Sequence, residues 1–235
     1  LFFKTLKDLL HSTSKYAVKN FEFSKNPLAI DIGSNDGTLL EGFKNQGFKV
    51  LGVEPTNIAK LANKKGIKTI QKFFDTKTAQ YIRKKFQKAE VITGTNIFAH
   101  INKLDSLMKG VKSLINIKNG IFVTESHYAV NILDEMQFDS IYHEHLRFYL
   151  LRPLIFLLNK YGFKVIDASR IPNYAGSIRV TATLNKNIQP KKSVKKLINQ
   201  EKKRGFYSEK KYKQYANKVI KVKKDLTELL YLHIV

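Results

Sequence analysis

The stretch LAIDIGSNDGTLLEGFKNQGFKVLGVEP, residues 28–55, decides the fold. Two short apolar runs flank a loop rich in Gly, Ser, Asn and Asp, and each run ends at a carboxylate, Asp31 and Glu54. A short buried run bounded by turn residues is typical of a strand in a parallel sheet, and the segment between the runs has the apolar spacing of a helix. The stretch therefore predicts a strand–loop–helix–strand unit with an acid at each strand end.

The same alternation continues along the chain. We expect strands at residues 28–32, 49–55, 67–74, 89–96 and 120–126, and helices at 36–47, 56–66, 75–87 and 104–120. Beyond a helix near 150–161, a short loop containing proline joins two more strands, 163–172 and 176–184. Alternating strands and helices build a mainly parallel sheet. The predicted fold class is α/β, a Rossmann-like sheet with an antiparallel last strand and Lys-rich C-terminal helices.

Three regions are expected from this pattern. Residues 1–26 form a helical lead-in, in which the polar cluster HSTSK (11–15) is predicted to cap a helix or form a turn. Residues 27–187 form the sheet domain, and residues 188–235 form the helical start of a further domain. Because the chain begins with Leu rather than Met, we expect it to be part of a longer protein.

The composition limits the class of protein. The chain has 235 residues, enough for one large domain, and no cysteine, which excludes disulfides and thiolate metal sites. No apolar run reaches the roughly 18 to 20 residues of a membrane span and no signal peptide is recognisable, so we expect a cytoplasmic protein without a membrane partner. The net charge of +23 comes from lysines along the whole chain, denser after residue 190. They form either a solvated surface or one that binds polyanions.

The loop after the first strand reads Asp-x-Gly-x-x-x-Gly, from Asp31 through Gly33 to Gly37. In an open parallel sheet, ligands bind beyond the carboxyl ends of the strands, and glycines let a ligand approach the backbone. Asp31 would repel a pyrophosphate but attract a ligand that carries a sulfonium and an ammonium group. Glu54 is suited to accept hydrogen bonds from ribose hydroxyls. The motif therefore favours S-adenosylmethionine over NAD, and a tight turn without a ligand is the alternative.

We expect the cofactor to contact the ends of four neighbouring strands. Phe74 follows the third strand and is a candidate for stacking on adenine, although it and Phe73 are equally suited to the core. Thr95 and Asn96 follow the fourth strand, where they would lie near the methionine end or cap the next turn. The complete predicted set of cofactor contacts is Asp31, Gly33, Ser34, Asn35, Gly37, Glu54, Pro55, Phe74, Thr95 and Asn96.

Histidines gather in and around the stretch FDSIYHEHLRFY, residues 138–149. The candidates are Tyr142, His143, Glu144 and His145 in this stretch, with His100 and His127 just after the fourth and fifth strands. Zinc ligation is one interpretation, but the spacing is not that of the helical His-Glu-x-x-His motif and no cysteine assists. A second interpretation is that these are polar loop residues whose side chains bond to the backbone. Acid–base chemistry is favoured, because histidine titrates near neutral pH and a carboxylate can orient it.

Taken in order, the motifs DIGSNDGTLL, GVEP, GTNIFAHI, FVTESHY, FDSIYHEHLRFY and GFKVIDASRIPNYAGSIRV resemble the class I sugar C-methyltransferases, which act on nucleotide-linked 4-keto deoxysugars. The resemblance runs from about residue 10 to the end of the sequence. It implies a class I methyltransferase fold, S-adenosylmethionine as cofactor and a nucleotide sugar as substrate. It also implies an N-terminal zinc module and a C-terminal α/β domain, which lie outside this sequence.

The resemblance also assigns roles to residues. It implies that Tyr142, Glu144 and His145 lie at the sugar and that His100 faces it. Our hypothesis is that His145 acts as a base oriented by Glu144, and that Tyr142 and His100 stabilise an enolate oxygen or hold the hydroxyl beside it. The expected substrate contacts are His127, His143, Ser177 and Arg179. Family members read His-Gly-Gly-Ser-x-Arg where this chain reads YAGSIR (174–179), so it departs from the pattern at the first two positions.

Two other functions are compatible with the sequence. One is O- or N-methylation of another small molecule, which needs less acidification of a C–H bond. The other is a basic RNA-binding or inactive methyltransferase-like protein. Against it, aromatic residues are sparse among the C-terminal lysines and no RNA-binding motif is evident. We therefore expect a small-molecule substrate rather than nucleic acid.

Overall fold

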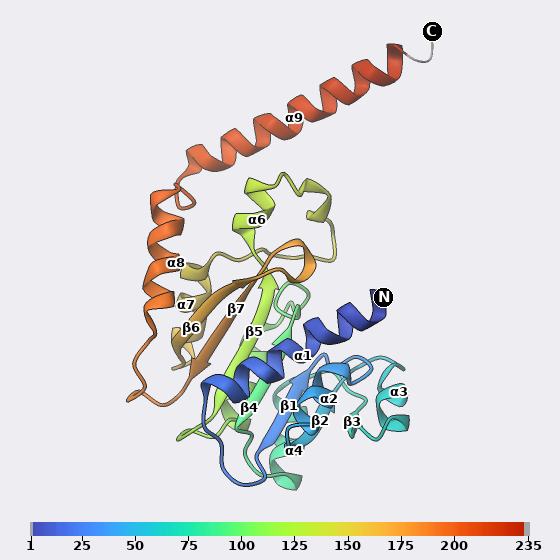
Figure 1. Ribbon diagram of the computed structural model, residues 1–235, viewed down its shortest axis with the longest axis vertical. Coiled ribbons are helices and arrows are strands. Elements are labelled where there is room, and N and C mark those ends of the chain that lie inside the picture. Colours follow the sequence, from blue (N-terminus) through green and yellow to red (C-terminus); the bar gives the residue numbers. More distant parts are fainter. Residues whose placement is uncertain (1, 233–235) are drawn as a thin grey trace.

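The computed structural model describes residues 2–232, and within them the side chains of 7–173 and 175–231. In this part of the chain, a seven-stranded sheet carries helices on both faces (Figure 1). The strand order is β3-β2-β1-β4-β5-β7-β6. The strands are β1 (Leu28–Ile32), β2 (Lys49–Val53), β3 (Thr69–Ile70), β4 (Val91–Thr95), β5 (Ile121–His127), β6 (Lys164–Ile171) and β7 (Ser177–Thr183).

The first five strands are parallel, and the predicted antiparallel end of the sheet is confirmed. β1 pairs in parallel with β2 and β4, and β4 with β5, whereas β7 pairs antiparallel with both β5 and β6. Parallel strands end at the same edge of a sheet. The residues that end β1, β2, β4 and β5 therefore lie along one edge, where ligands bind in open α/β sheets.

Helices follow the strands in the predicted order. They are α1 (Phe2–Asn20), α2 (Thr38–Lys44), α3 (Ala59–Lys64), α4 (Thr76–Lys85), α5 (Leu104–Leu114), α6 (Ala129–Asp134), α7 (Leu151–Lys160), α8 (Lys192–Lys203) and α9 (Glu209–Leu232), with the single turns η1 (Phe138–Ser140) and η2 (Asn173–Ala175). The predicted strand 67–74 is only two residues long, and the predicted helix 104–120 ends at Leu114. Propensity sets where an element forms, but its ends depend on packing.

Alternating side chains of the strands pack into two hydrophobic cores, one on each face of the sheet. Ile30 and Ile92 belong to the core shared with α4, α5 and α7, whereas their neighbours Ala29 and Val91 belong to the core shared with α1 and α2. This period of two is the geometry of a strand that is covered on both faces. It explains why the strands read as continuous apolar runs.

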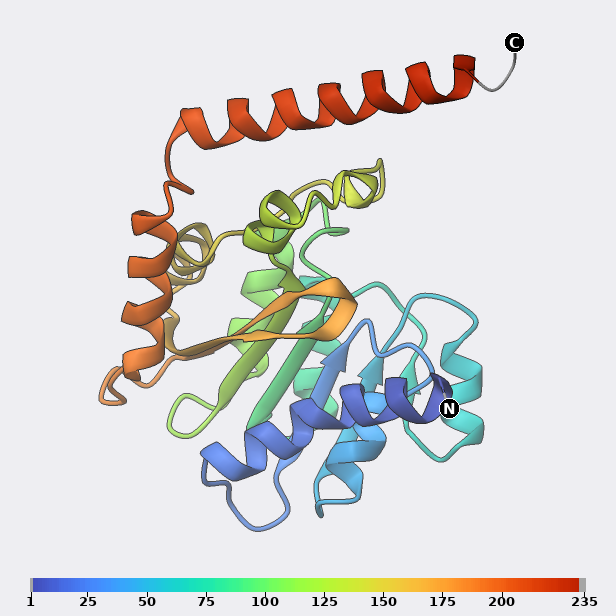
Figure 2. The ribbon, with the colours of Figure 1, turned by 45° about the horizontal axis from the view of Figure 1, so that its top comes forward.

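The N-terminal helix contradicts one prediction. The cluster HSTSK (11–15) neither caps a helix nor forms a turn, because it lies inside α1, which crosses one face of the sheet (Figure 2). Its hydroxyl groups find buried partners, such as the bond from Thr13 to the Glu125 carboxylate. Tertiary hydrogen bonds thus keep polar residues in a helix that their local preference for turns opposes.

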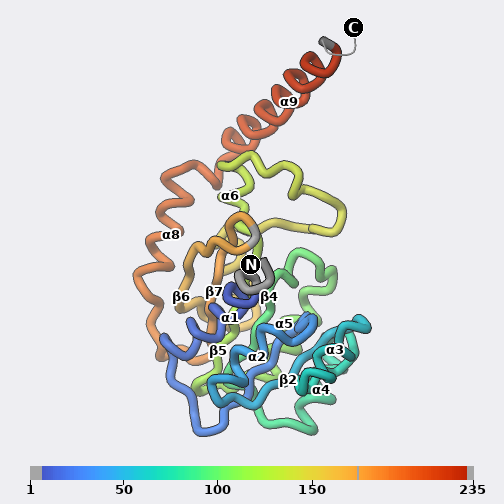
Figure 3. Tube along the Cα trace, turned by 45° about the vertical axis from the view of Figure 1, so that its right-hand side comes forward, coloured from blue at the N-terminus to red at the C-terminus, as the bar shows by residue number. Residues whose placement is uncertain are grey.

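The two C-terminal helices differ in how they pack. α8 lies against β6 and α7, and its Val194 and Leu197 join the core. α9 leaves the body and extends into solvent, as Figures 1 and 3 show from different sides. The predicted Lys-rich helices are confirmed. Among the described residues, no helix is long and apolar enough to cross a membrane.

Candidate functional site

Two left-handed glycines shape the loop between β1 and α2. Gly33 has a φ of 73° and Gly37 a φ of 82°, values that side chains strongly disfavour. A Cβ on Gly33 would lie 2.8 Å from Cγ2 of Ile97, and a Cβ on Gly37 would lie 2.9 Å from Cγ2 of Ile67. Both positions therefore require glycine, and the loop can bring its backbone close to the space beyond β1.

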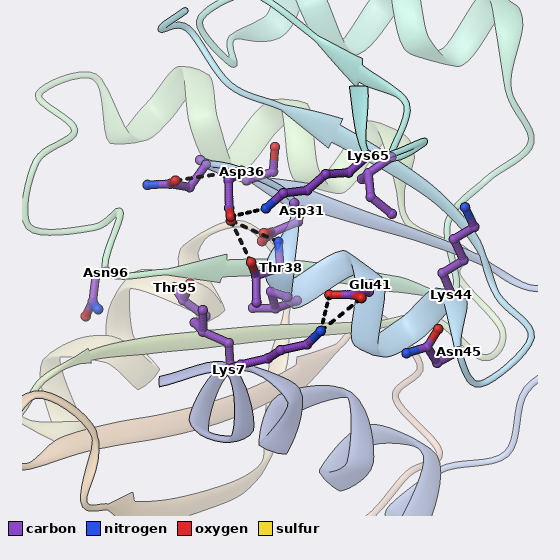
Figure 4. Close-up of a pocket in the computed structure, with 17 residues that line it drawn as sticks. Lys7, Asp31, Asp36, Thr38, Glu41, Lys44, Asn45, Lys65, Thr95 and Asn96 are labelled. Carbon is purple, nitrogen blue, oxygen red and sulfur yellow. Dashed lines mark hydrogen bonds and ion pairs between the residues drawn. The ribbon is translucent and has the colours of Figure 1, made fainter. Parts of the chain in front are cut away.

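A cavity of about 800 Å³ opens at this loop (Figure 4). Its size suits a small-molecule ligand or cofactor. Seven of the ten predicted cofactor contacts line it, namely Asp31, Gly33, Ser34, Asn35, Gly37, Thr95 and Asn96. The sequence did not predict the contribution of α1, which provides Lys7 and Leu10.

The other three predicted contacts lie outside the cavity wall. Glu54 is buried directly behind it, where one carboxylate oxygen accepts the N–H of Asn35 at 3.1 Å and the other accepts the hydroxyl of Thr56 at 2.7 Å. Pro55 follows Glu54 in this turn. Phe74 packs against Gly110 of α5, which is the core role that the sequence also allowed.

Asp31 is the most perturbed acid of the cavity. Its side chain is 2% exposed and accepts a hydrogen bond of 2.6 Å from the hydroxyl of Thr93. Burial raises the pKa of Asp31 to about 7, and the charges of Glu125 and Glu54 act in the same direction. A cation in the cavity would favour the ionised carboxylate. The nearby Ser34 hydroxyl is buried beside Gly52 of β2 and has no hydrogen-bond partner among the described residues.

Glu125, at the end of β5, is a site residue that sequence reasoning missed. It forms a buried ion pair of 2.7 Å with Nε of Arg179 and also accepts the hydroxyl of Thr13 at 2.7 Å. Arg179 in turn donates to the hydroxyl of Ser12 at 2.9 Å. These bonds fasten α1 to the sheet beside the cavity. The one hint in the sequence was the cluster of hydroxyl residues at 11–15, but the sequence alone does not show that these side chains face the ion pair of Glu125 and Arg179.

Arg179 and Ser177 are buried side chains with internal partners. Both were expected to contact the substrate. The guanidinium of Arg179 is buried against Glu125, and the buried hydroxyl of Ser177 donates to the carbonyl of Asn173 at 2.9 Å. Internal bonds occupy both side chains in this structure, and their contact with the substrate stays a prediction.

Three of the four predicted catalytic side chains come together. The rings of His100 and His145 have centroids 4.9 Å apart, and those of Tyr142 and His145 lie 4.5 Å apart. The hydroxyl of Tyr142 is 3.3 Å from Nε2 of His145. The backbone N–H of Leu146 donates to the carbonyl of Ala99 at 2.9 Å, which holds the two loops together. The cluster therefore joins the exit of β4 to the segment before α7.

The environment of His145 favours the neutral ring. Burial lowers its pKa below the usual value, and the charges of His100 and His127 act in the same direction, against opposing effects of the Ser140 backbone and of Glu144. A neutral histidine near pH 7 is able to accept a proton. Nδ1 of His145 is buried and has no hydrogen-bond partner in the part of the chain that the structure describes.

Glu144 does not make the expected contact. It is exposed, and among the described residues it acts on His145 as a nearby charge rather than through a hydrogen bond. His143 is also exposed, with its ring 6.0 Å from that of Tyr142. The prediction that Glu144 orients His145 is therefore not carried forward for this conformation.

His127 lies at the edge of the same cluster. Its Nε2 is 2.9 Å from the side-chain oxygen of Gln137, and its ring is 6.2 Å from that of Phe148. The described residues contain no group of three or more His, Asp or Glu side chains arranged to hold a metal ion. The exit of β4 connects the two parts of the site, because Asn96 lines the cavity and His100 follows four residues later.

The fold and this strand-edge cavity are those of a methyltransferase domain, and the family comparison agrees. Residues 3–168 match the family model described as a methyltransferase domain, so the chain belongs to this family, as the sequence predicted. Residues 172–233 match the model described as a C-methyltransferase C-terminal domain.

A curated relative makes the assignment more specific. The chain is 30% identical over 217 residues to the C-methyltransferase NovU of Streptomyces niveus. The aligned part is 91% of this chain and 51% of NovU, so the chain spans about half the length of this relative. Together with the C-terminal match, this confirms the predicted resemblance to C-methyltransferases.

Solved structures confirm the fold class. Magnesium protoporphyrin IX methyltransferase from Synechocystis, with bound SAH, superposes with a TM-score of 0.57 at 13% identity over 75% of this chain and 82% of that one. A SAM-dependent methyltransferase from Archaeoglobus fulgidus gives a TM-score of 0.58 at 15% identity, over 75% of this chain and 93% of that one. At these identities, the likeness establishes the Rossmann-like architecture only.

Proposed function

We propose that the chain is an S-adenosylmethionine-dependent C-methyltransferase that acts on a nucleotide-linked 4-keto deoxysugar. The observation that carries the proposal is the contact of the His145 ring with those of His100 and Tyr142, with His100 four residues after the cavity residue Asn96. Methylation at carbon requires removal of a C–H proton, and a neutral histidine flanked by hydrogen-bond donors suits that task. The similarity to NovU, which is named a C-methyltransferase, supports methylation at carbon.

The residues of the cavity fit S-adenosylmethionine. Asp31 offers a buried carboxyl group that a cation would ionise, and Ser34 offers a buried hydroxyl without a partner among the described residues. Glu54 follows β2 and accepts the N–H of the cavity residue Asn35, and we assign it to the ribose hydroxyls. When bound, S-adenosylmethionine would supply a methyl group made electrophilic by its sulfonium.

The rings of His100, Tyr142 and His145, called the His/Tyr cluster below, supply the acid–base chemistry in this proposal. A ketone acidifies the adjacent C–H bond, and His145 takes that proton while the C–H electron pair passes into an enolate. The hydroxyl of Tyr142 and the ring of His100 donate hydrogen bonds to the enolate oxygen. Donors fixed before the reaction stabilise such developing charge more effectively than water does. The resulting substrate is nucleophilic at carbon.

Hydrogen exchange tests this proposal without methyl transfer. The chain is incubated in D₂O with S-adenosylhomocysteine and a nucleotide 4-ketosugar, and NMR follows deuterium entering the carbon beside the ketone. We expect exchange with the wild type and a loss of about 100-fold or more in His145→Gln. Calorimetry should show that the variant binds S-adenosylhomocysteine like the wild type. Full exchange by the variant, or methylation of substrates without a ketone, would refute the proposal.

A further inference from the structure

Glu201 of α8 is a buried carboxylate outside the site described above. Its side chain is 1% exposed and accepts hydrogen bonds from the hydroxyl of Tyr128 at 2.7 Å, the backbone N–H of Leu151 at 2.6 Å and the hydroxyl of Tyr207. It forms no ion pair with the described residues. A buried carboxylate without a cation is costly unless several donors satisfy it. Three donors from three parts of the chain do so here.

Two of these donors bracket the segment that carries the His/Tyr cluster. Tyr128 directly follows His127 at the end of β5, and Leu151 opens α7 just after Tyr149. Between them, the backbone N–H of Ala129 donates to the carbonyl of Tyr149 at 3.1 Å. One carboxylate therefore fastens both ends of a segment that leaves the sheet and returns to it.

The part of the segment nearest to His145 is held by few other bonds. Leu146 donates to the carbonyl of Ala99, and the guanidinium of Arg147 donates to the carbonyl of Ile101 at 2.8 Å. Most side chains from 138 to 146 are exposed. The position of the His145 ring thus depends on how firmly the two ends of the segment are anchored.

We propose that Glu201 is a positioning residue that, through Tyr128 and Leu151, holds the ring of His145 against that of His100. Glu201 lies in the stretch that matches the C-methyltransferase C-terminal domain, whereas the cluster lies in the stretch that matches the methyltransferase domain. The carboxylate therefore ties the two matched regions together at the site. Its effect on turnover rests on the proposed function, but its effect on the geometry of the site does not.

The titration of His145 measures this geometry in the absence of substrate. The groups that act on its ring are His100, His127 and Glu144, with burial and the backbone at Ser140. If the segment loosens, the ring leaves its buried place beside His100, and its pKa rises toward the usual value. Loss of the Glu201 charge alone would act in the opposite direction, because removing a negative charge lowers a histidine pKa. The sign of the change therefore separates the two effects.

The chain offers a matched control in Glu90. This carboxylate is 4% exposed and likewise accepts three hydrogen bonds, two from Ser24 and one from the side-chain amide of Asn119 at 2.6 Å. It precedes β4 at the opposite edge of the sheet. Glu90→Ala should therefore lower stability in the way that Glu201→Ala does, but leave the titration of His145 unchanged.

The experiment is an NMR pH titration of the His145 ring, assigned with His145→Gln, in the full chain. We expect a raised pKa in Glu201→Ala and the wild-type pKa in Glu90→Ala. Glu201→Gln should not raise the pKa, because its amide oxygen still accepts from Tyr128 and Leu151 and only the charge is lost. A wild-type titration in Glu201→Ala, or an equal change in Glu90→Ala, would overturn the proposal. A Glu201→Gln variant that behaves like Glu201→Ala would do so as well.

A milder variant keeps the test decisive if Glu201→Ala does not fold. Tyr128→Phe removes one of the hydroxyl groups that bind Glu201 and should raise the pKa of His145 by a smaller amount. An unchanged pKa would count against the positioning role of Glu201. In an active preparation, Glu201→Ala should lower kcat by up to about 100-fold with an unchanged dissociation constant for S-adenosylmethionine, because small displacements of catalytic groups are costly. If the His145 titration shifts as expected but no methyl transfer is found in any variant, the proposed function fails while the positioning role stands.

Discussion

The affinity for S-adenosylmethionine should fall as the pH is lowered through 7, because binding requires ionised Asp31. The pKa of this buried carboxyl group is raised to about 7, so its neutral form dominates below that pH in the free protein. The sulfonium and ammonium groups of the ligand favour the carboxylate. Binding therefore expels a proton at low pH, and the cost of that step weakens the complex.

The size of the effect follows from the pKa. If only the ionised form binds, the dissociation constant is multiplied by one plus the ratio of neutral to ionised Asp31. With a pKa of about 7, this factor is about 2 at pH 7 and about 33 at pH 5.5, a weakening of roughly 16-fold or about 1.6 kcal/mol. This range lies below the titration of the ligand's own α-amino group near 7.7 to 8.0.

Isothermal titration in buffers of different ionisation enthalpy measures both the affinity and the protons released. At pH 5.5 the wild type should release nearly one proton on binding. Asp31→Asn mimics the protonated carboxyl group, so at pH 7 it should bind at least as weakly as the wild type does at pH 5.5, without the pH dependence. His145→Gln serves as a control, because it leaves Asp31 in place and should keep the slope. An equal affinity at both pH values, or a slope that survives in Asp31→Asn, would refute the reasoning.

Three further predictions concern the same edge of the sheet. Folding raises the pKa of Asp31 from 3.8 to about 7, so its buried charge destabilises the folded protein increasingly as the pH rises from about 4 to 7. Urea unfolding should therefore show Asp31→Asn gaining up to about 4 kcal/mol on the wild type between pH 4 and pH 8, and a constant difference would contradict this. Arg179→Met should destabilise the protein by about 3 to 5 kcal/mol in urea unfolding, because it leaves Glu125 buried without its cation, and a loss below 1 kcal/mol would show that the pair is dispensable. Gly33→Ala should weaken binding of S-adenosylmethionine at least tenfold in calorimetry, because its Cβ meets Ile97, whereas Gly47→Ala, with a similar φ but open space, should bind normally.

The sheet was predictable because its signals are local. β1 was predicted at its observed residues, and each later strand lies within its predicted range or differs from it by one residue. Continuous apolar runs, glycines after α2 and α3 and acids at the ends of β1 and β2 are enough to define this alternation. The predictions failed where tertiary contacts overrule local preference. The hydroxyl cluster at 11–15 is helical because Glu125 and Arg179, more than a hundred residues away, accept and donate its hydrogen bonds.

The candidate site was predictable in part, for the same reason. The loop from Asp31 to Gly37 and the pair Thr95 and Asn96 line the cavity, because strand ends are fixed by the order of the strands. Arg179 was assigned to the substrate because a motif gives a side chain's identity but not its direction. In β7 it is paired with Glu125 across the register to β5, a contact that only the antiparallel pairing reveals.

The edge of the sheet concentrates negative charge in a strongly basic protein. The chain carries a formal charge of +23, yet Asp31, Glu54 and Glu125 are buried together at the carboxyl ends of β1, β2 and β5. Salt screens exposed lysines over about 8 Å but screens buried carboxylates much less, so the acids determine the potential inside the cavity. Arg179 pairs with Glu125, which leaves the carboxyl groups of Asp31 and Glu54 without an ion pair among the described residues. In the proposed complex, Asp31 matches the cationic groups of S-adenosylmethionine and Glu54 matches its ribose, while the outer lysines would attract a phosphate-bearing substrate. A single fold thus offers a cation site within and an anion-attracting surface outside, which is the arrangement that the proposed pair of ligands requires.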